Sequence, residues 1–209
     1  MHNVIPQVFI GDEIHSEVWL KDVEFRRGES YCINAESGTG KTSLCSFIYG
    51  LRTDYEGEIF FDEADISDFR DSKWCDIRRN HLAYLPQELD IFGELTALDN
   101  VILKNRLTDF KSETEIRQMF ELLEIDNRIN ALCGRMSVGQ RQRVALIRAL
   151  CQPFDFIILD EPVSHLDERN NKFCANLIQS AASALNAGII FTSVGYALRL
   201  SGINKSLAL

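Results

Sequence analysis

Membrane-spanning and secretory signals are missing from this 209-residue chain. Its most apolar stretch, residues 156–159, stops at Asp160 and is far shorter than the roughly 20 residues of a transmembrane helix. The first residues show no basic segment followed by an apolar one, which is the pattern of a secretory signal. The sequence therefore favours a cytoplasmic protein.

Cysteine pairing motifs and an excess of positive charge are missing as well. The six cysteines are scattered, none forms a C-x-x-C pair, and most lie in apolar segments, which indicates buried reduced thiols. The formal net charge is −9, and an acidic surface argues against a nucleic-acid partner, which normally requires a basic face. What remains is the composition of an ordinary globular domain, 45% hydrophobic and 25% charged.

The most informative segment is A-E-S-G-T-G-K-T at residues 35–42, which has the pattern of a phosphate-binding loop. Its glycines let the backbone approach phosphate oxygens, and its N–H groups form an anion-binding nest with the N-terminus of the following helix. Lys41 supplies charge for the outer phosphates, and the Thr42 hydroxyl is suited to ligate Mg²⁺. The β-prone run 29–34 and the helical pattern 43–49 give the loop its required context. The residues that we expect to contact the nucleotide here are Glu36, Ser37, Gly38, Thr39, Gly40, Lys41, Thr42 and Ser43.

Two carboxylates follow the buried strand that we expect at residues 156–159. Ligands of a parallel sheet bind beyond the carboxyl ends of its strands, where the phosphate loop also begins, so the two groups can meet. Asp160 is then suited to hold Mg²⁺, and Glu161 to orient or deprotonate the water that attacks the γ-phosphate. Together with Lys41, these acids predict a site for Mg²⁺ and a nucleoside triphosphate.

Strand-like and helix-like segments alternate along the chain, which indicates an α/β fold with a mostly parallel sheet. Between 97 and 131 the pattern is helical, with a capping box at Ser112 and Glu115, so we expect an inserted helical subdomain there. Strands are expected at 18–25, 58–62, 82–85, 154–159 and 188–192, and further helices at 137–150 and 170–185.

The segment S-V-G-Q-R-Q-R-V-A-L-I-R-A-L at residues 137–150 closely resembles the signature of ATP-binding cassette (ABC) proteins. Small residues at the start of a helix expose N–H groups and the Ser137 hydroxyl to an anion, while apolar residues behind them anchor the helix in the core. We expect Arg141, Arg143 and Arg148 to form a solvated or salt-bridged face.

The resemblance covers nearly the whole chain and implies further site residues. Gln87 resembles the family's Q-loop glutamine, which reaches the metal and senses the transmembrane partner, and residues 164–167 resemble its D-loop at the dimer interface. Residues 21–25 and 57–59 resemble its antiparallel β-subdomain. The resemblance implies catalytic roles for Glu161, Gln87 and Lys41, nucleotide contacts from Ser137, Gly139 and Gln140, and magnesium ligation by Thr42, Gln87 and Asp160.

The implied fold is a P-loop NTPase core with an antiparallel β-subdomain, formed by residues 1–86 and 137–209, and a helical subdomain at 87–136. The family implies ATP and Mg²⁺ as ligands, a transmembrane permease as partner, and head-to-tail pairing with a second copy or a related ATPase subunit. It also implies a peripheral position at the inner face of the cell membrane. Residues 92–100 and 167–170 look most like ATPase subunits of lipoprotein-releasing and macrolide-export transporters, but neither the substrate nor its direction is readable.

Three positions depart from the family pattern. Ala35 replaces a glycine and is strained only if its φ is positive. Val138 replaces the first glycine of the signature, where a β-branched residue would be badly placed at positive φ. Ser193 stands where the family has a histidine that contacts the γ-phosphate, which predicts slow hydrolysis with nucleotide binding retained.

Two other points stay open from the sequence. The aromatic residue that stacks on adenine can be Phe9 or, less well, His15, or be absent, whereas Trp19 fits a core position. A regulatory module that binds ATP and barely hydrolyses it is an alternative to a transporter ATPase. A DNA-repair clamp with the same cassette is a second one, but it normally needs a long coiled-coil insertion, and residues 87–137 leave no room for that.

Overall fold

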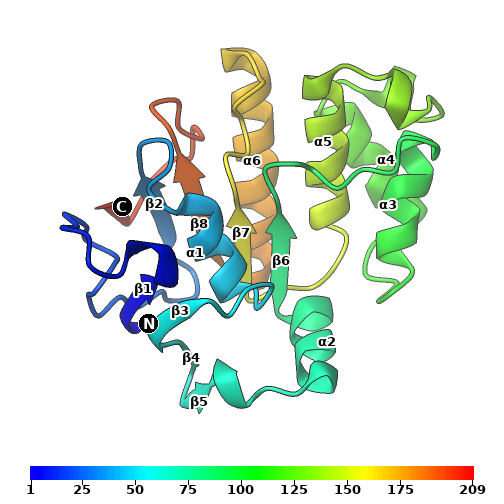
Figure 1. The fold of residues 1–209 in the computed structure, drawn as a ribbon. Coiled ribbons are helices and arrows are strands. Elements are labelled where there is room, and N and C mark those ends of the chain that lie inside the picture. The colour runs from blue at the N-terminus through cyan, green and yellow to red at the C-terminus, as the bar shows by residue number, and fades with distance from the viewer.

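A parallel sheet is the centre of the structure, which is a computed structural model describing residues 1–209. The strands are β1 (His2–Pro6), β2 (Ser30–Asn34), β3 (Tyr55–Glu58), β4 (Phe60–Phe61), β5 (Ala64–Asp65), β6 (Leu82–Leu85), β7 (Phe156–Leu159), β8 (Gly188–Ser193) and β9 (Lys205–Ala208). The α-helices are α1 (Lys41–Ile48), α2 (Asp71–Asn80), α3 (Ala97–Asn105), α4 (Glu113–Leu122), α5 (Val138–Ala149) and α6 (Glu168–Leu185). The central sheet has the order β6-β7-β8-β2-β9, and β1–β3 and β4–β5 form two antiparallel pairs (Figure 1).

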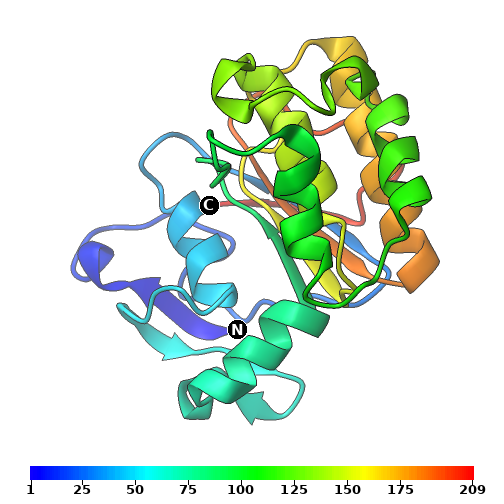
Figure 2. The same ribbon diagram turned by 90° about the vertical axis from the view of Figure 1, so that its right-hand side faces the viewer.

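Alternate residues of the central strands enter two different hydrophobic cores. Ile157 and Leu159 of β7 join a core with helices α3 to α6, whereas Ile158 joins a second core with α1. The side chains of β8 alternate in the same way, since Phe191 lies in the first core and Ile190 in the second. Because both faces of these strands are buried, their sequence is a continuous apolar run rather than an alternating one. Figure 2 shows α3 to α6 gathered on one side and the blue and cyan N-terminal elements on the other.

The α/β fold with its parallel sheet, its separate antiparallel strands and its helical block is therefore confirmed. The capping box is also present: the Ser112 hydroxyl accepts the N–H of Glu115 at 3.2 Å, and the Glu115 carboxylate accepts the N–H of Ser112 at 2.8 Å. Hydrogen bonds that the Glu115 carboxylate accepts from the N–H and the hydroxyl of Ser112 and from Lys111 lower its pKa to about 2. The subdomain limits at residues 87 and 136 stay a prediction.

The prediction of a strand at residues 18–25 was wrong, because no regular strand forms there. The segment does pair loosely with β1: the N–H of Leu20 donates to the carbonyl of Val4 at 2.9 Å, and the N–H of Val23 to that of Met1 at 3.0 Å. Leu20, however, has a φ of 57°, in the left-handed region, which interrupts an extended ladder. Strand β1 takes the place beside β3 instead.

The strand expected at residues 58–62 is split between the end of β3 and β4, and β1, α2, β5 and β9 were not expected from the sequence. The apolar pattern of α2 and β9 is weak: Ile77 is the one buried residue of α2, and β9 has no fully buried residue. Such elements gain their stability from tertiary contacts, as when β9 pairs with β2 at the sheet edge. No helix in the structure has both the length and the apolar character needed to cross a membrane.

Candidate active site

The loop at residues 35–40 joins the end of β2 to the start of α1, as the sequence predicts. Gly38 has a φ of 85° and Gly40 a φ of 96°, a left-handed conformation that favours glycine. Ala35 and Val138 do not have positive φ, so the strain that the sequence raised for these two positions is absent. The loop therefore keeps its glycines where the backbone requires them.

Two aromatic residues support this loop. The Nε1 group of Trp19 donates to the carbonyl of Thr39 at 3.1 Å, and Trp19 is buried, as predicted for a core aromatic. A Cβ at Gly40 would lie 3.0 Å from the Phe9 ring and 3.1 Å from the Trp19 ring. Phe9 thus lies against the phosphate loop, whereas the His15 side chain is 90% exposed.

Lys41 is the first residue of α1 and is only 7% exposed. Its ammonium group donates to the carbonyl of Glu36 at 2.8 Å and lies 3.6 Å from the Glu161 carboxylate. The loop lysine and the second of the two acids therefore meet, although 120 residues of sequence separate them. This contact joins the two motifs into one site.

Asp160 is the centre of the hydrogen-bond network in this site. Its side chain is almost fully buried, and its two oxygens accept from the Thr42 hydroxyl at 2.7 Å and from the Thr192 hydroxyl at 2.8 Å. The Thr42 hydroxyl also lies 3.5 Å from the amide oxygen of Gln87. Hydroxyl, carboxylate and amide oxygens are the hard ligands that Mg²⁺ prefers, so the donor set of Thr42, Asp160 and Gln87 fits this ion.

Two ionisable groups near Asp160 have raised pKa values. Burial raises the pKa of Cys45 well above its usual value, and burial also raises that of Tyr84. Both groups therefore stay neutral at physiological pH. No cluster of three His, Cys, Asp or Glu side chains suited to a metal occurs in the chain, so a cation here would depend on the Thr42 and Gln87 oxygens as well.

Glu161 has an unusual backbone for its residue type. Its φ is 50°, which is uncommon outside glycine, asparagine and aspartate and indicates stored strain. Its N–H donates to the Thr192 hydroxyl at 2.9 Å, and its carbonyl accepts from the Gln142 amide at 3.2 Å. Sequence reasoning missed Thr192 and Gln142, because a threonine in a strand and a glutamine in a helix carry no signal of their own.

Ser193 ends β8, which lies between β7 and β2 in the sheet. It is only 3% exposed, and its hydroxyl has no hydrogen-bond partner. Its carbonyl accepts the N–H of Ala35 at 3.1 Å, which ties the strand end to the start of the phosphate loop. A buried hydroxyl without a partner costs free energy, so this serine contributes no side-chain hydrogen bond to the strand end.

The signature segment forms a second, separate feature. Ser137 caps α5, and its hydroxyl accepts the N–H of Gln140 at 3.2 Å while the Gln140 side chain accepts the N–H of Ser137 at 3.0 Å. A Cβ at Gly139 would lie 3.0 Å from the carbonyl of His165, so the signature packs closely on residues 164–167. No hydrogen bond or ion pair joins residues 137–140 to residues 35–43.

The prediction that Arg143 and Arg148 form a solvated or salt-bridged face of α5 was wrong. Arg143 donates to the carbonyl of Leu123 at 2.7 Å and to the Asn170 side chain at 2.9 Å. Arg148 donates to the carbonyls of Leu89 and Asp90. Desolvation lowers the pKa of both guanidinium groups, which agrees with their partial burial. They are structural donors to backbone oxygen rather than a charged surface.

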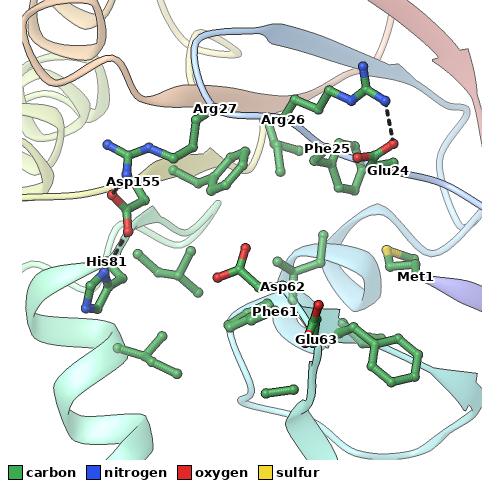
Figure 3. A pocket seen from close by; sticks show the side chains of 18 of the residues that line it. Met1, Glu24, Phe25, Arg26, Arg27, Phe61, Asp62, Glu63, His81 and Asp155 are labelled. Atoms are coloured by element: carbon green, nitrogen blue, oxygen red, sulfur yellow. Dashed lines mark hydrogen bonds and ion pairs between the residues drawn. The ribbon is translucent and has the colours of Figure 1, made fainter.

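A cavity lies elsewhere, at the edge of the sheet where β6 and β7 begin. It measures about 1180 Å³ and is lined largely by apolar residues, among them Phe25 and Phe61 (Figure 3). The carboxylate of Asp155 accepts from Arg27 at 2.8 Å and lies 2.6 Å from the His81 ring. These wall charges are satisfied by one another, so cavity size alone would misplace the chemistry of this protein.

Comparison with known proteins agrees with this geometry. The profile of the ABC transporter family matches residues 21–164. A lipoprotein-releasing system ATP-binding protein, LolD, from Francisella tularensis is 31% identical over 89% of this chain and 83% of its own length. The ABC transporter ATP-binding protein YtrE of Bacillus subtilis is 28% identical over 90% of this chain and 82% of its own.

A solved structure is similar over most of the chain. The dimeric ATP-binding cassette MJ0796, in a post-hydrolysis state bound to ADP and Pi, superposes with a TM-score of 0.74 at 26% identity. The match covers 88% of this chain and 82% of that one. With the matching profile, the relatives and the joined phosphate-loop and carboxylate motifs, this chain belongs to the ATP-binding proteins of the ABC transporter family.

Proposed function

We propose that this protein is the ATP-binding and ATP-hydrolysing subunit of an ABC transporter and powers a separate transmembrane permease. The observation that carries the proposal is the joint site in which Lys41 meets Glu161 and Thr42 bonds Asp160. Family membership supports nucleotide binding, and this joint site supports hydrolysis. No transported substrate is assigned, because the permease would contact it.

Each residue of the site has a proposed role. Lys41 and the loop residues 36–43 bind the phosphates through charge and N–H groups. Thr42, Asp160 and Gln87 hold Mg²⁺, which when bound would neutralise charge on the phosphate oxygens. Glu161 orients and deprotonates the attacking water. Phe9, which lies against Gly40, is the best-placed aromatic for the adenine.

The second nucleotide surface is proposed to come from a partner ATPase subunit. Ser137, which is exposed, and the partly buried Gly139 and Gln140 lie at the start of α5 and are not bonded to the phosphate loop of their own chain. In a head-to-tail pair, this region of one copy closes over the ATP held by the other, and hydrolysis releases the pair. The dimeric structure of MJ0796 supports such an arrangement. We place the pair at the inner face of the cell membrane through its permease.

A binding module with little hydrolysis is the second candidate, and Ser193 favours it. Its buried hydroxyl is short, uncharged and unpartnered where a stabilising donor would be expected. The two candidates share nucleotide binding and differ in turnover alone.

Calorimetry and single-turnover hydrolysis test the proposal together. Folded wild-type protein should take up Mg-ATP, and Lys41→Met should abolish that uptake because it removes the phosphate-binding charge. Glu161→Gln should bind ATP but hydrolyse it at least about 100-fold more slowly, since a general base contributes that much. Equal inactivity of wild type and Glu161→Gln, with both binding ATP, would favour the binding module. No uptake of Mg-ATP by folded wild type would refute both candidates.

A further inference from the structure

We propose that Arg148 is a positioning residue for Gln87, holding the loop after β6 so that the Gln87 amide faces Thr42 and Asp160. The inference rests on the proposed function, because it assumes that Gln87 serves a magnesium site. It adds a residue that lies at the far end of the signature helix and that contacts no part of the nucleotide loop.

The contacts of Arg148 are with the backbone of this loop. Its two terminal nitrogens donate to successive carbonyls, to Leu89 at 2.7 Å and to Asp90 at 2.5 Å. Arginine suits this task because its planar fork presents two donors at once, whereas lysine is a point charge on a flexible stem. The guanidinium is also half-buried, so its bonds are poorly replaced by water.

The loop needs such support because its own conformation is strained. Leu89 has a φ of 66° and Asp90 a φ of 48°, two successive residues in the left-handed region, which a leucine rarely adopts. Its internal hydrogen bonds are few, from Leu89 to Pro86 at 3.1 Å and from Asp90 to Glu88 at 2.9 Å. Strain of this kind persists only when surrounding contacts determine the backbone.

The other end of the loop is fixed independently. The fully buried Asn100 of α3 exchanges hydrogen bonds with Phe92, accepting its N–H at 2.9 Å and donating to its carbonyl at 3.0 Å. Strand β6 fixes the start, and Asn100 fixes the exit. Between them, Leu89 is buried in the first core, and Arg148 holds the carbonyls of Leu89 and Asp90.

Gln87 itself has little else to hold it. Its side chain is exposed, and its one polar contact is the Thr42 hydroxyl at 3.5 Å, whose proton is already donated to Asp160. Its position relative to Asp160 therefore follows from the backbone of residues 86–90. A change in that backbone moves the amide oxygen away from the cation site without touching the phosphate loop.

The test is the effect of Mg²⁺ on ATP affinity, measured by calorimetry in EDTA and in Mg²⁺. Arg148→Met should leave the affinity for metal-free ATP unchanged and reduce the Mg²⁺-dependent gain by about tenfold, the size of effect expected when a support of a metal ligand is lost. Arg148→Lys should recover part of the gain because it can still hold one carbonyl.

The matched control is Arg143→Met on the same helix. Arg143 is also partly buried and also bonds a backbone carbonyl, that of Leu123, but it does not contact the Gln87 loop. It should lower the melting temperature as Arg148→Met does and keep the full Mg²⁺ effect. An equal loss of the Mg²⁺ effect in both variants would overturn the inference and indicate a general structural role.

Further measurements keep the inference testable if Arg148→Met does not fold. In a Gln87→Ala background, Arg148→Lys should cause no additional loss of the Mg²⁺ effect, because its action passes through Gln87; an additive loss would contradict that route. Hydrogen exchange at residues 87–92 should be faster in Arg148→Lys than in wild type, and unchanged exchange would count against the positioning role. Absence of Mg-ATP binding by wild type would instead refute the proposed function, so the two failures are distinguishable.

Discussion

The two ends of the central sheet differ in which side chains meet there. Where the strands end, a small network joins Lys41, Thr42, Asp160, Glu161 and Thr192 through short contacts and strained backbone. Where β6 and β7 begin, a cavity of about 1180 Å³ is lined largely by apolar residues, and Asp155 in its wall pairs with Arg27 and His81. The difference shows that the candidate site is marked by converging polar groups, and not by empty volume.

The reason lies in the geometry of parallel strands. Loops that leave neighbouring carboxyl ends converge, so residues distant in sequence meet there with their N–H groups and side chains directed at the same point. At the other end lie the antiparallel β4–β5 pair and α2, as the lower part of Figure 1 shows. Four predictions test this contrast, and they follow from the largest expected effect to the smallest.

The largest difference is expected between two aspartates, one at each end. Asp160→Asn should slow ATP hydrolysis roughly 100- to 1,000-fold, because an amide replaces the charge that faces Thr42 and the cation. Asp155→Asn also alters a carboxylate with two partners, Arg27 and His81, but it should leave hydrolysis unchanged and lower only the melting temperature. A comparable loss of hydrolysis from both variants would remove the functional contrast between the two ends.

A gain of function is expected at Ser193. Ser193→His should accelerate single-turnover hydrolysis, by up to about 100-fold, if a donor to the γ-phosphate is what this site lacks. Ser193→Ala should leave the rate unaltered, because the native hydroxyl has no partner to lose. Slower hydrolysis in the alanine variant would mean that the serine hydroxyl itself takes part, and an unchanged rate in a folded histidine variant would count against this account.

The phosphate loop should tolerate alanine unequally at its two left-handed glycines. Gly40→Ala should cost about 1–3 kcal/mol of stability from backbone strain, with further loss because its Cβ would meet Phe9 and Trp19. Gly38→Ala carries the strain alone, since nothing lies within 4 Å of its Cβ. Thermal denaturation and Mg-ATP titration of both variants measure this. Equal losses would mean that the aromatic support is unimportant.

The smallest effect is expected in the helical block, away from both ends. The native state holds the pKa of Glu115 at about 2, below its ordinary 4.5, so its stabilising effect is present above pH 4.5 and is lost as pH falls through about 2. Glu115→Gln should therefore flatten the acid limb of the stability curve and leave ATP hydrolysis at neutral pH unaltered. An unchanged acid limb in this variant would show that the capping box contributes nothing measurable.

Much of the site was predictable from local patterns. The loop at 35–42 and the acids at 160–161 are contiguous motifs, and each carries its chemistry in neighbouring residues. Strands such as β7 and helices such as α6 have long apolar patterns, and these were expected close to their observed limits. Roles assigned to the signature residues remain predictions, because they depend on a second chain.

Other features had no local signal. Thr192, Gln142 and Arg148 reach the site or its supports from segments whose sequence is that of an ordinary strand or helix. The failure at residues 18–25 has the same origin, since a β-rich composition does not reveal the left-handed Leu20 that interrupts the strand. Tertiary packing overrides local propensity at such positions.

By itself the sequence determined the class of chemistry, because a phosphate loop, paired acids and a capped signature helix are each encoded within a few consecutive residues. Three sets of contacts form only in the folded chain. Lys41 meets Glu161, and Thr42 and Thr192 both bond Asp160. Arg148 bonds the backbone of the loop that follows Gln87. The physical reason is that these contacts join segments brought together by the order of strands in the sheet. Strand order arises from packing both faces of that sheet at once, and no single segment contains that information.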